Sequence, residues 1–439
     1  MVVVFVLVAL LMVGVLVTAN WYVWRRLFRD TTRAPGPVRR IGAAVIAGGW
    51  LLAVGALVAE RAGAPFWLQR VLAWPGFLWL ALSIYLLLAV LAGEVVRPLL
   101  RRFLERRAAA RRTAGAEPSV TPAADTSRIP AGTAPPKAPE APEAPEAPSE
   151  APGAEAPSGG SPLAVPSRRL FVSRVVAGAA AAAAVGTVGY GTYGVLSGPK
   201  VKRVTVPLAK LPRAAHGFRI AVVSDIHLGP VLGRGFAQQV VDTINSTQPD
   251  LVAVVGDLVD GSVKDLGPAA APLAQLKARH GAYFVTGNHE YFSGAEQWVA
   301  EVRRLGLIPL ENARTELPHF DLAGVNDVAG EDEGQGPDYD RALGDRDRSR
   351  ACVLLAHQPV QIHDAVDHGV DLQLSGHTHG GQLWPGNLIA GAANPTLAGL
   401  ERYGDTQLYV SRGAGAWGPP TRVGAPSDIT VIELASRQA

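Results

Sequence analysis

Three long apolar runs dominate the start of the chain, at residues 2–23, 41–59 and 71–96. About 20 apolar residues in a helix span the hydrocarbon core of a bilayer, so each run predicts a transmembrane helix. Trp21 and Trp24 end the first run, where amphipathic rings favour the membrane interface. This run lacks a basic start and a small-residue cleavage site, which favours a retained helix over a signal peptide.

Arginines flank these runs unevenly. Six arginines lie between the first and second runs and seven follow the third, whereas only two separate the second from the third. Basic residues accumulate on the cytoplasmic side of membrane proteins. We therefore expect residues 1–112 to form a multi-pass transmembrane helical region with its Arg-rich flanks inside and its N-terminus outside.

Residues 113–166 have a different composition, rich in Ala, Pro, Glu, Ser and Gly, with a repeated Ala-Pro-Glu unit at 138–148. Few of these side chains could bury apolar area, so we expect a disordered and extended linker.

The segment 167–198 combines the pair Arg168-Arg169 with an apolar run at about 175–196. It predicts either a fourth membrane helix or a twin-arginine export signal, and both would carry the following domain across the membrane. A run too weakly apolar to insert would instead leave that domain in the cytoplasm. The charge asymmetry favours placing that domain on the extracytoplasmic side of the cell membrane.

The pattern changes at residue 217, where short β-branched runs begin to alternate with stretches of helical periodicity. We expect buried strands at 219–223, 251–255, 282–285, 352–356 and 371–374. We expect helices at 236–246, 268–279 and 295–305. This alternation predicts an α/β domain over residues 217–436.

Almost every predicted strand ends in residue types that bind metal ions. In chain order these candidate ligands are Asp225, His227, Asp257, Asn288, His357, His377 and His379. A lone His-x-His or Asp-x-His is more often a chance pair, but five such motifs in series, each after a strand, indicate a site. The carboxyl ends of strands converge in α/β sheets, so five loops would deliver these side chains to one crevice.

Oxygen and imidazole donors without a thiolate suit Mn, Fe, Zn or Mg. Seven donors exceed the needs of one tetrahedral ion and fit two divalent ions, about 3.5–4 Å apart, that share a carboxylate.

The five motifs, in this order, resemble those of the calcineurin-like metallophosphoesterase family, and within it the membrane-associated bacterial branch. The resemblance covers residues 217–436 and implies two mixed β-sheets packed face to face with helices outside. It implies a first ion held by Asp225, His227, Asp257 and His379. It implies a second ion held by Asp257, Asn288, His357 and His377. His289 matches the residue that protonates the leaving group or stabilises the transition state, and Glu290 stands where the family often has Asp.

The resulting hypothesis is a membrane-anchored hydrolase of phosphomonoesters or phosphodiesters that uses a metal-bridging hydroxide. The expected partners are the lipid bilayer and a phosphoester, for which lipid-linked and cell-envelope substrates are attractive because the chain is tethered. A non-catalytic metal-binding sensor on the same fold is the alternative. A transport function is disfavoured because the first three apolar runs contain almost no charged residues, Glu94 excepted.

The remaining polar residues predict no further chemistry. The net charge of +3 is too small to suggest nucleic acid, and Cys352 lies in an apolar run typical of a buried thiol. Asp260 and Asp327 could either support the metal ligands through hydrogen bonds or form turns, and we favour turns. The resemblance allows a substrate-facing flap at 326–350, and we favour a solvated loop. Five histidines are expected to be structural, namely His216, His280, His319, His363 and His368.

Overall fold

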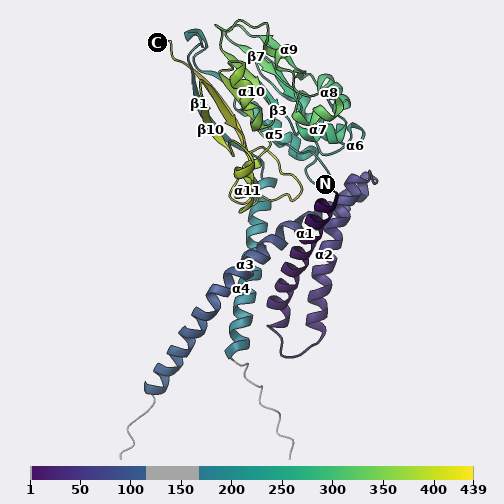
Figure 1. Cartoon of the computed structure of the whole chain (residues 1–439), viewed down its shortest axis with the longest axis vertical. Helices are drawn as coiled ribbons and strands as arrows, with labels where there is room; N and C mark the ends of the chain where they lie inside the picture. Colours follow the sequence, from purple (N-terminus) through teal and green to yellow (C-terminus); the bar gives the residue numbers. More distant parts are fainter. Residues whose placement is uncertain (1, 115–167, 439) are drawn as a thin grey trace, which may run out of the picture.

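The computed structural model describes residues 2–114 and 168–438, so all but the first two residues of the linker predicted at 113–166 lie outside the described residues. Four long helices precede an α/β domain (Figure 1). They are α1 (Val2–Trp24), α2 (Pro37–Arg61), α3 (Phe66–Ala114) and α4 (Arg168–Leu196). All four are long and apolar enough to cross a membrane. Helix α3 runs past the predicted span and into the expected linker, because residues 99–114 are mostly good helix formers.

The Arg-rich segments gather at the end of the helices that is remote from the α/β domain. Arg26 of the α1–α2 connection forms a 2.6 Å ion pair with Glu94 of α3, and Arg97 lies 3.4 Å from the same carboxylate. Arg174 of α4 donates to the carbonyl of Thr31 in the α1–α2 connection. Figure 1 shows the N-terminus and the α2–α3 turn at the opposite end, beside the domain.

The domain contains two six-stranded mixed sheets, which confirms the predicted fold class. The first sheet has the order β1 (Lys200–Leu208), β12 (Asp428–Ser436), β2 (Phe218–Val223), β3 (Leu251–Val255), β4 (Ala282–Val285) and β5 (Ile308–Pro309). The second has the order β10 (Gly399–Tyr403), β11 (Thr406–Val410), β9 (Leu372–Ser375), β8 (Cys352–Leu355), β7 (Asp321–Gly324) and β6 (Ala313–Glu316).

Each central strand is buried on both faces because it separates two apolar layers. In β2, Ala221 and Val223 face a helical layer, whereas Ile220 and Val222 face the other sheet. This burial explains why the strands read as continuous apolar runs rather than as alternating ones. The helices of the domain are α5 (Arg234–Ser246), α6 (Val263–Ala270), α7 (Asn288–Ser293), α8 (Ala295–Arg304), α9 (Tyr339–Leu343), α10 (Ile362–Asp367) and α11 (Gly386–Ala393).

Two local expectations are wrong. The helix predicted at 268–279 is instead α6 followed by a 3₁₀ turn, because Ser262 caps the backbone of Asp265 and starts the helix earlier. The segment 326–350 is not simply a solvated loop, since it contains α9, whose Tyr339 packs in the core. Cys352 is buried as predicted, and burial raises the pKa of its thiol to about 12.

Candidate metal centre

The seven candidate ligands meet at one edge of the domain, where strands from both sheets end. Loops after β2, β3 and β4 in the first sheet carry four of them, and loops after β8 and β9 in the second carry three. Three overlapping groups of histidine and carboxylate side chains have donor atoms within 4.8 Å of one another. The structure therefore brings together side chains that lie up to 154 residues apart in the chain, from Asp225 to His379.

The first group consists of Asp225, His227 and His379, all buried. The Nε2 atoms of His227 and His379 are 3.0 Å apart. His379 Nε2 also lies 3.3 Å from Asp225 Oδ1. Three donor atoms thus face a common point.

The second group consists of Asp257, His357 and His377, with Asn288 beside it. His357 Nε2 lies 3.1 Å from Asp257 Oδ2, and His377 Nδ1 lies 2.9 Å from Asn288 Oδ1. Asp257 Oδ2 is also 3.8 Å from His227 Nε2 of the first group. This carboxylate therefore lies between the two groups.

These distances suit metal ions. Two donors about 2.1 Å from one ion and at right angles to each other are about 3 Å apart. His357 donates from Nδ1 to the carbonyl of Val255, and its buried Nε2 faces Oδ2 of Asp257 at 3.1 Å. The bond at Nδ1 fixes the ring so that Nε2 is the atom directed into the cluster. The residues present fit two ions that share Asp257.

The backbone of the site is held in an uncommon conformation. Eight non-glycine residues in the described part of the chain have positive φ, and five of them are candidate ligands. They are Asp225, His227, Asp257, His377 and His379. Left-handed backbone is costly for such residues and gathers at functional sites, where the surrounding structure enforces it.

Two glycines allow the loops to approach one another closely. A Cβ at Gly376 would overlap the side chain of Ser224, and one at Gly287 would overlap the carboxylate of Asp257. Any larger residue at these positions would therefore push apart the loops that carry the donors.

Burial and neighbouring charges shift the pKa values of the carboxyl and imidazole groups in the cluster. Burial opposes ionisation of Asp257, but the charges of His357 and His227 hold the pKa of this carboxyl far below its usual range. Burial and the neighbouring His357 lower the pKa of His377 to about 4, and burial with His227 lowers that of His379. Neutral imidazoles beside an ionised carboxylate present lone pairs to a cation.

Asp260 is not the turn residue expected from the sequence. Its Oδ1 lies 2.9 Å from His227 Nδ1 and 2.7 Å from His289 Nδ1. One buried carboxylate thus orients a candidate ligand and the candidate acid together, and the two histidines lower its pKa to about 2 against the effect of burial. Asp327, by contrast, caps a 3₁₀ turn by accepting from Ala329, as expected.

Two other residues that support the centre carried no sequence signal for that role. Arg422 is buried, donates to the carbonyl of His379 at 3.0 Å, and lies 3.2 Å from its Nδ1. Glu290 is also buried and accepts from the backbone of Asp257 and Leu258, which fixes the loop after β3. The sequence places Glu290 in the motif but gives no means of aligning Arg422 with a histidine 43 residues away.

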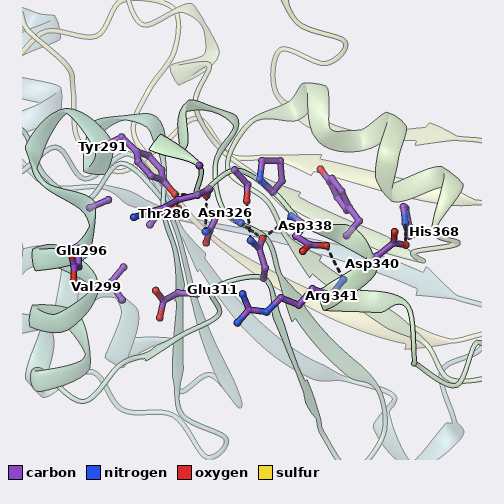
Figure 2. Close-up of a pocket in the computed structure, with 17 residues that line it drawn as sticks. Thr286, Tyr291, Glu296, Val299, Glu311, Asn326, Asp338, Asp340, Arg341 and His368 are labelled. Atoms are coloured by element: carbon purple, nitrogen blue, oxygen red, sulfur yellow. Dashed lines mark hydrogen bonds and ion pairs between the residues drawn. The ribbon is translucent and has the colours of Figure 1, made fainter. Parts of the chain in front are cut away.

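A second depression, which we call the α8–α9 hollow, has a volume of about 860 Å³. Tyr291, Glu296 and Val299 line one side of it, and Asp338 and Asp340 line the other (Figure 2). None of the candidate ligands is among its lining residues. His368, expected to be structural, lies at its rim and bonds to the carbonyl of Asp364.

With this geometry established, comparison with known proteins identifies the family. Residues 218–381 match the family described as calcineurin-like phosphoesterase. A transmembrane protein with metallophosphoesterase domain from Danio rerio is 39% identical over 259 residues, which cover 56% of this chain and 59% of that protein. An uncharacterized metallophosphoesterase of Helicobacter pylori is 40% identical over 247 residues, which cover 56% of this chain and 66% of that protein.

A third relative, an uncharacterized metallophosphoesterase of Aquifex aeolicus, is 33% identical over 243 residues, which cover 54% of this chain and 92% of that protein. The chain spans less than two thirds of the length of the first two relatives. The four apolar helices and the transmembrane relative indicate that the chain is associated with a membrane. On this likeness and on the convergence of its candidate metal ligands, the chain belongs to the calcineurin-like phosphoesterase family.

Proposed function

We propose that the chain is a membrane-anchored hydrolase of phosphomonoesters or phosphodiesters that works with two divalent metal ions of the Mn, Fe, Zn and Mg class. The observation that carries this proposal is the pair of donor groups on either side of Asp257, 3.1 Å from His357 Nε2 and 3.8 Å from His227 Nε2. A single structural ion would need only one of these groups.

The proposed first ion is held by Asp225, His227, Asp257 and His379, and the second by Asp257, Asn288, His357 and His377. Bound there, two dications would lower the pKa of a shared water and offset the charge of the phosphoryl oxygens. Asp257 contributes a full negative charge between the two positions, which an amide of the same shape would not.

His289 is the proposed general acid. Its Nδ1 is fixed by the 2.7 Å hydrogen bond to Asp260, so Nε2 is the atom that would pass a proton to the leaving oxygen. Burial lowers the pKa of His289, but the bond to Asp260 outweighs it and raises the pKa to about 9. A protonated histidine beside the ligands supports a hydrolase over a non-catalytic sensor, which needs no acid.

We further propose that the chain crosses the membrane several times, with its Arg-rich end in the cytoplasm and the α/β domain outside. The contacts of Arg26, Arg97 and Arg174 at one end of the helices support this orientation, because basic flanks favour the cytoplasmic side. The proposed partners are the bilayer and a phosphoester, and the net charge of +3 gives no reason to add nucleic acid.

The test uses the full chain in detergent, with metal analysis and turnover of p-nitrophenyl phosphate and bis(p-nitrophenyl) phosphate. We expect both ions to be lost to a chelator together with turnover, and Mn²⁺ to restore both. A chain that binds two ions but cleaves neither ester would support the sensor instead. Asp405→Asn, a fully exposed carboxylate in the β10–β11 turn, is the matched control for ligand variants and should behave as the unaltered chain.

A further inference from the structure

The strand directions place the candidate metal centre on the membrane side of the domain. Strand β1 starts at Lys200, directly after α4 ends at Leu196, and runs away from the membrane helices. Strand β12 is parallel to β1, and β2 is antiparallel to β12, so β2 runs back toward the helices. Strands β3 and β4 are parallel to β2. The carboxyl ends that carry Asp225, Asp257 and Asn288 therefore face the membrane.

The turn between α2 and α3 contacts this edge of the domain. Phe66, at the start of α3, packs on the core cluster that includes Leu228, one residue after His227. Val231 in the same loop packs on the cluster formed by Ala56 of α2 with Ala73 and Phe77 of α3. Near the end of α2, the Glu60 carboxylate is close enough to interact electrostatically with Asp260 and with the two histidines that Asp260 holds. The helical hairpin thus forms one wall beside the site.

Helix α4 contacts the other side of the site through the segment that holds His379. The hydroxyls of Thr192 and Thr421 are 2.7 Å apart, and the backbone of Arg422 donates to Gly191. An apolar groove of about 440 Å³ lies here, between Tyr190 with its small neighbours on α4 and residues 422–424. Arg422 connects this groove with the centre, because it also binds His379.

Exposed apolar side chains continue this membrane-facing surface onto the domain. On α11, Leu388 and Ile389 are 68% and 76% exposed. The carbonyl of Trp384, just before α11, accepts a hydrogen bond from Tyr85 of α3, which places this segment beside the membrane helices. Such a patch on a domain joined to four apolar helices suits contact with the bilayer.

Two exposed aromatic side chains lie beside His289. Phe292 is 72% exposed and Trp417 is 51% exposed. Their rings lie 5.5 Å and 5.8 Å from the ring of His289. The phosphate group itself would gain little from two aromatic side chains at this position, whereas a hydrocarbon chain would bury apolar area against them.

We propose that the substrate is a lipid phosphoester whose hydrocarbon chains stay in the same bilayer while its phosphate reaches the centre past Phe292 and Trp417. This rests on the proposed hydrolase function and specifies its substrate class. The exposed apolar side chains of α11 keep the domain at the bilayer surface, and the groove on α4 binds the lipid chains there. The hydrolytic reaction needs only water, which adds to phosphorus as the lipid or head-group oxygen leaves with a proton.

The test compares two chromogenic esters that share a leaving group, methyl p-nitrophenyl phosphate in solution and hexadecyl p-nitrophenyl phosphate. The full chain is reconstituted with Mn²⁺ in phosphatidylcholine nanodiscs, and the hexadecyl ester is incorporated in the same discs. We expect kcat/KM to be about tenfold or more higher for the hexadecyl ester, because its chain concentrates the phosphate beside the centre. Equal values for the two esters would overturn the lipid proposal, whereas hydrolysis of neither would overturn the hydrolase function itself.

Ile389→Asp tests the surface without touching the centre. It should leave turnover of the methyl ester unchanged and remove most of the preference for the hexadecyl ester. Its matched control is Ile308→Asp, which changes an exposed isoleucine on edge strand β5 and should preserve the preference. An unchanged preference in Ile389→Asp, with the folded state verified by methyl-ester turnover, would contradict the role of α11.

Discussion

The candidate metal centre and the α8–α9 hollow are both regions of one domain where polar side chains gather, yet they differ in how their polar atoms are used. In the hollow, Asp338 accepts from the backbone of Arg341, and the largely exposed Asp340 carboxylate lies 3.5 Å from His368 Nε2. At the centre, Asp257 is buried between two groups of donors. Buried histidine and carboxylate donors that converge on one point mark a site for cations, and the volume of a hollow does not.

The largest difference between the two regions is expected when the negative charge of Asp257 is removed. Asp257→Asn should lose at least one ion and lower turnover by about 10³-fold, because the carboxylate that neutralises both ions is gone. Metal analysis and ester turnover measure both effects. Asp340→Asn makes the same chemical change in the hollow and should alter neither. Full metal content with normal turnover in Asp257→Asn would remove the shared-ligand assignment.

His289→Ala distinguishes the role of a general acid from that of a metal ligand. We expect the ions to remain bound while kcat falls by about 10²-fold, since proton transfer to the leaving oxygen is lost. His368→Ala, at the rim of the hollow, is the corresponding control and should leave kcat unchanged. Loss of an ion from His289→Ala would instead make His289 a ligand.

Asp260→Asn should have a smaller effect of about tenfold on metal affinity and on kcat, because His227 and His289 lose the negative charge beside their Nδ1 atoms but keep an amide oxygen as acceptor. Titration with Mn²⁺ and steady-state kinetics give the two values. If neither moved, Asp260 would be the turn residue that the sequence suggested.

The smallest expected effect lies in the hollow. Asp338 caps α9, and Asp338→Ala should cost about 1 kcal/mol of stability without changing turnover. Thermal unfolding should show a melting temperature lower by about 2–4 °C. A fall in turnover at unchanged stability would mean that the hollow takes part in the chemistry, and the contrast between the two regions would no longer hold.

Local patterns in the sequence were sufficient to predict the membrane helices and the central strands of the domain. Apolar runs predicted α1 to α4, and continuous β-branched runs predicted β2, β3, β4, β8 and β9, because burial on both faces requires such side chains. The candidate ligands could be read because each follows a strand, and strand ends in α/β sheets converge. The end of α3 and the start of α6 were missed, since helix ends depend on single caps and on flanking helix formers.

The sequence by itself determined which side chains could bind metal ions and which segments could enter a membrane. Only the tertiary structure decided that Asp260 lies between His227 and His289, that Arg422 supports His379, and that the centre faces the helices. These relations join residues far apart in the chain through sheet register and the antiparallel pairing of β12 with β2. No local pattern encodes these relations. The sequence around an aspartate or arginine in a loop is the same whether its side chain contacts a distant histidine or water.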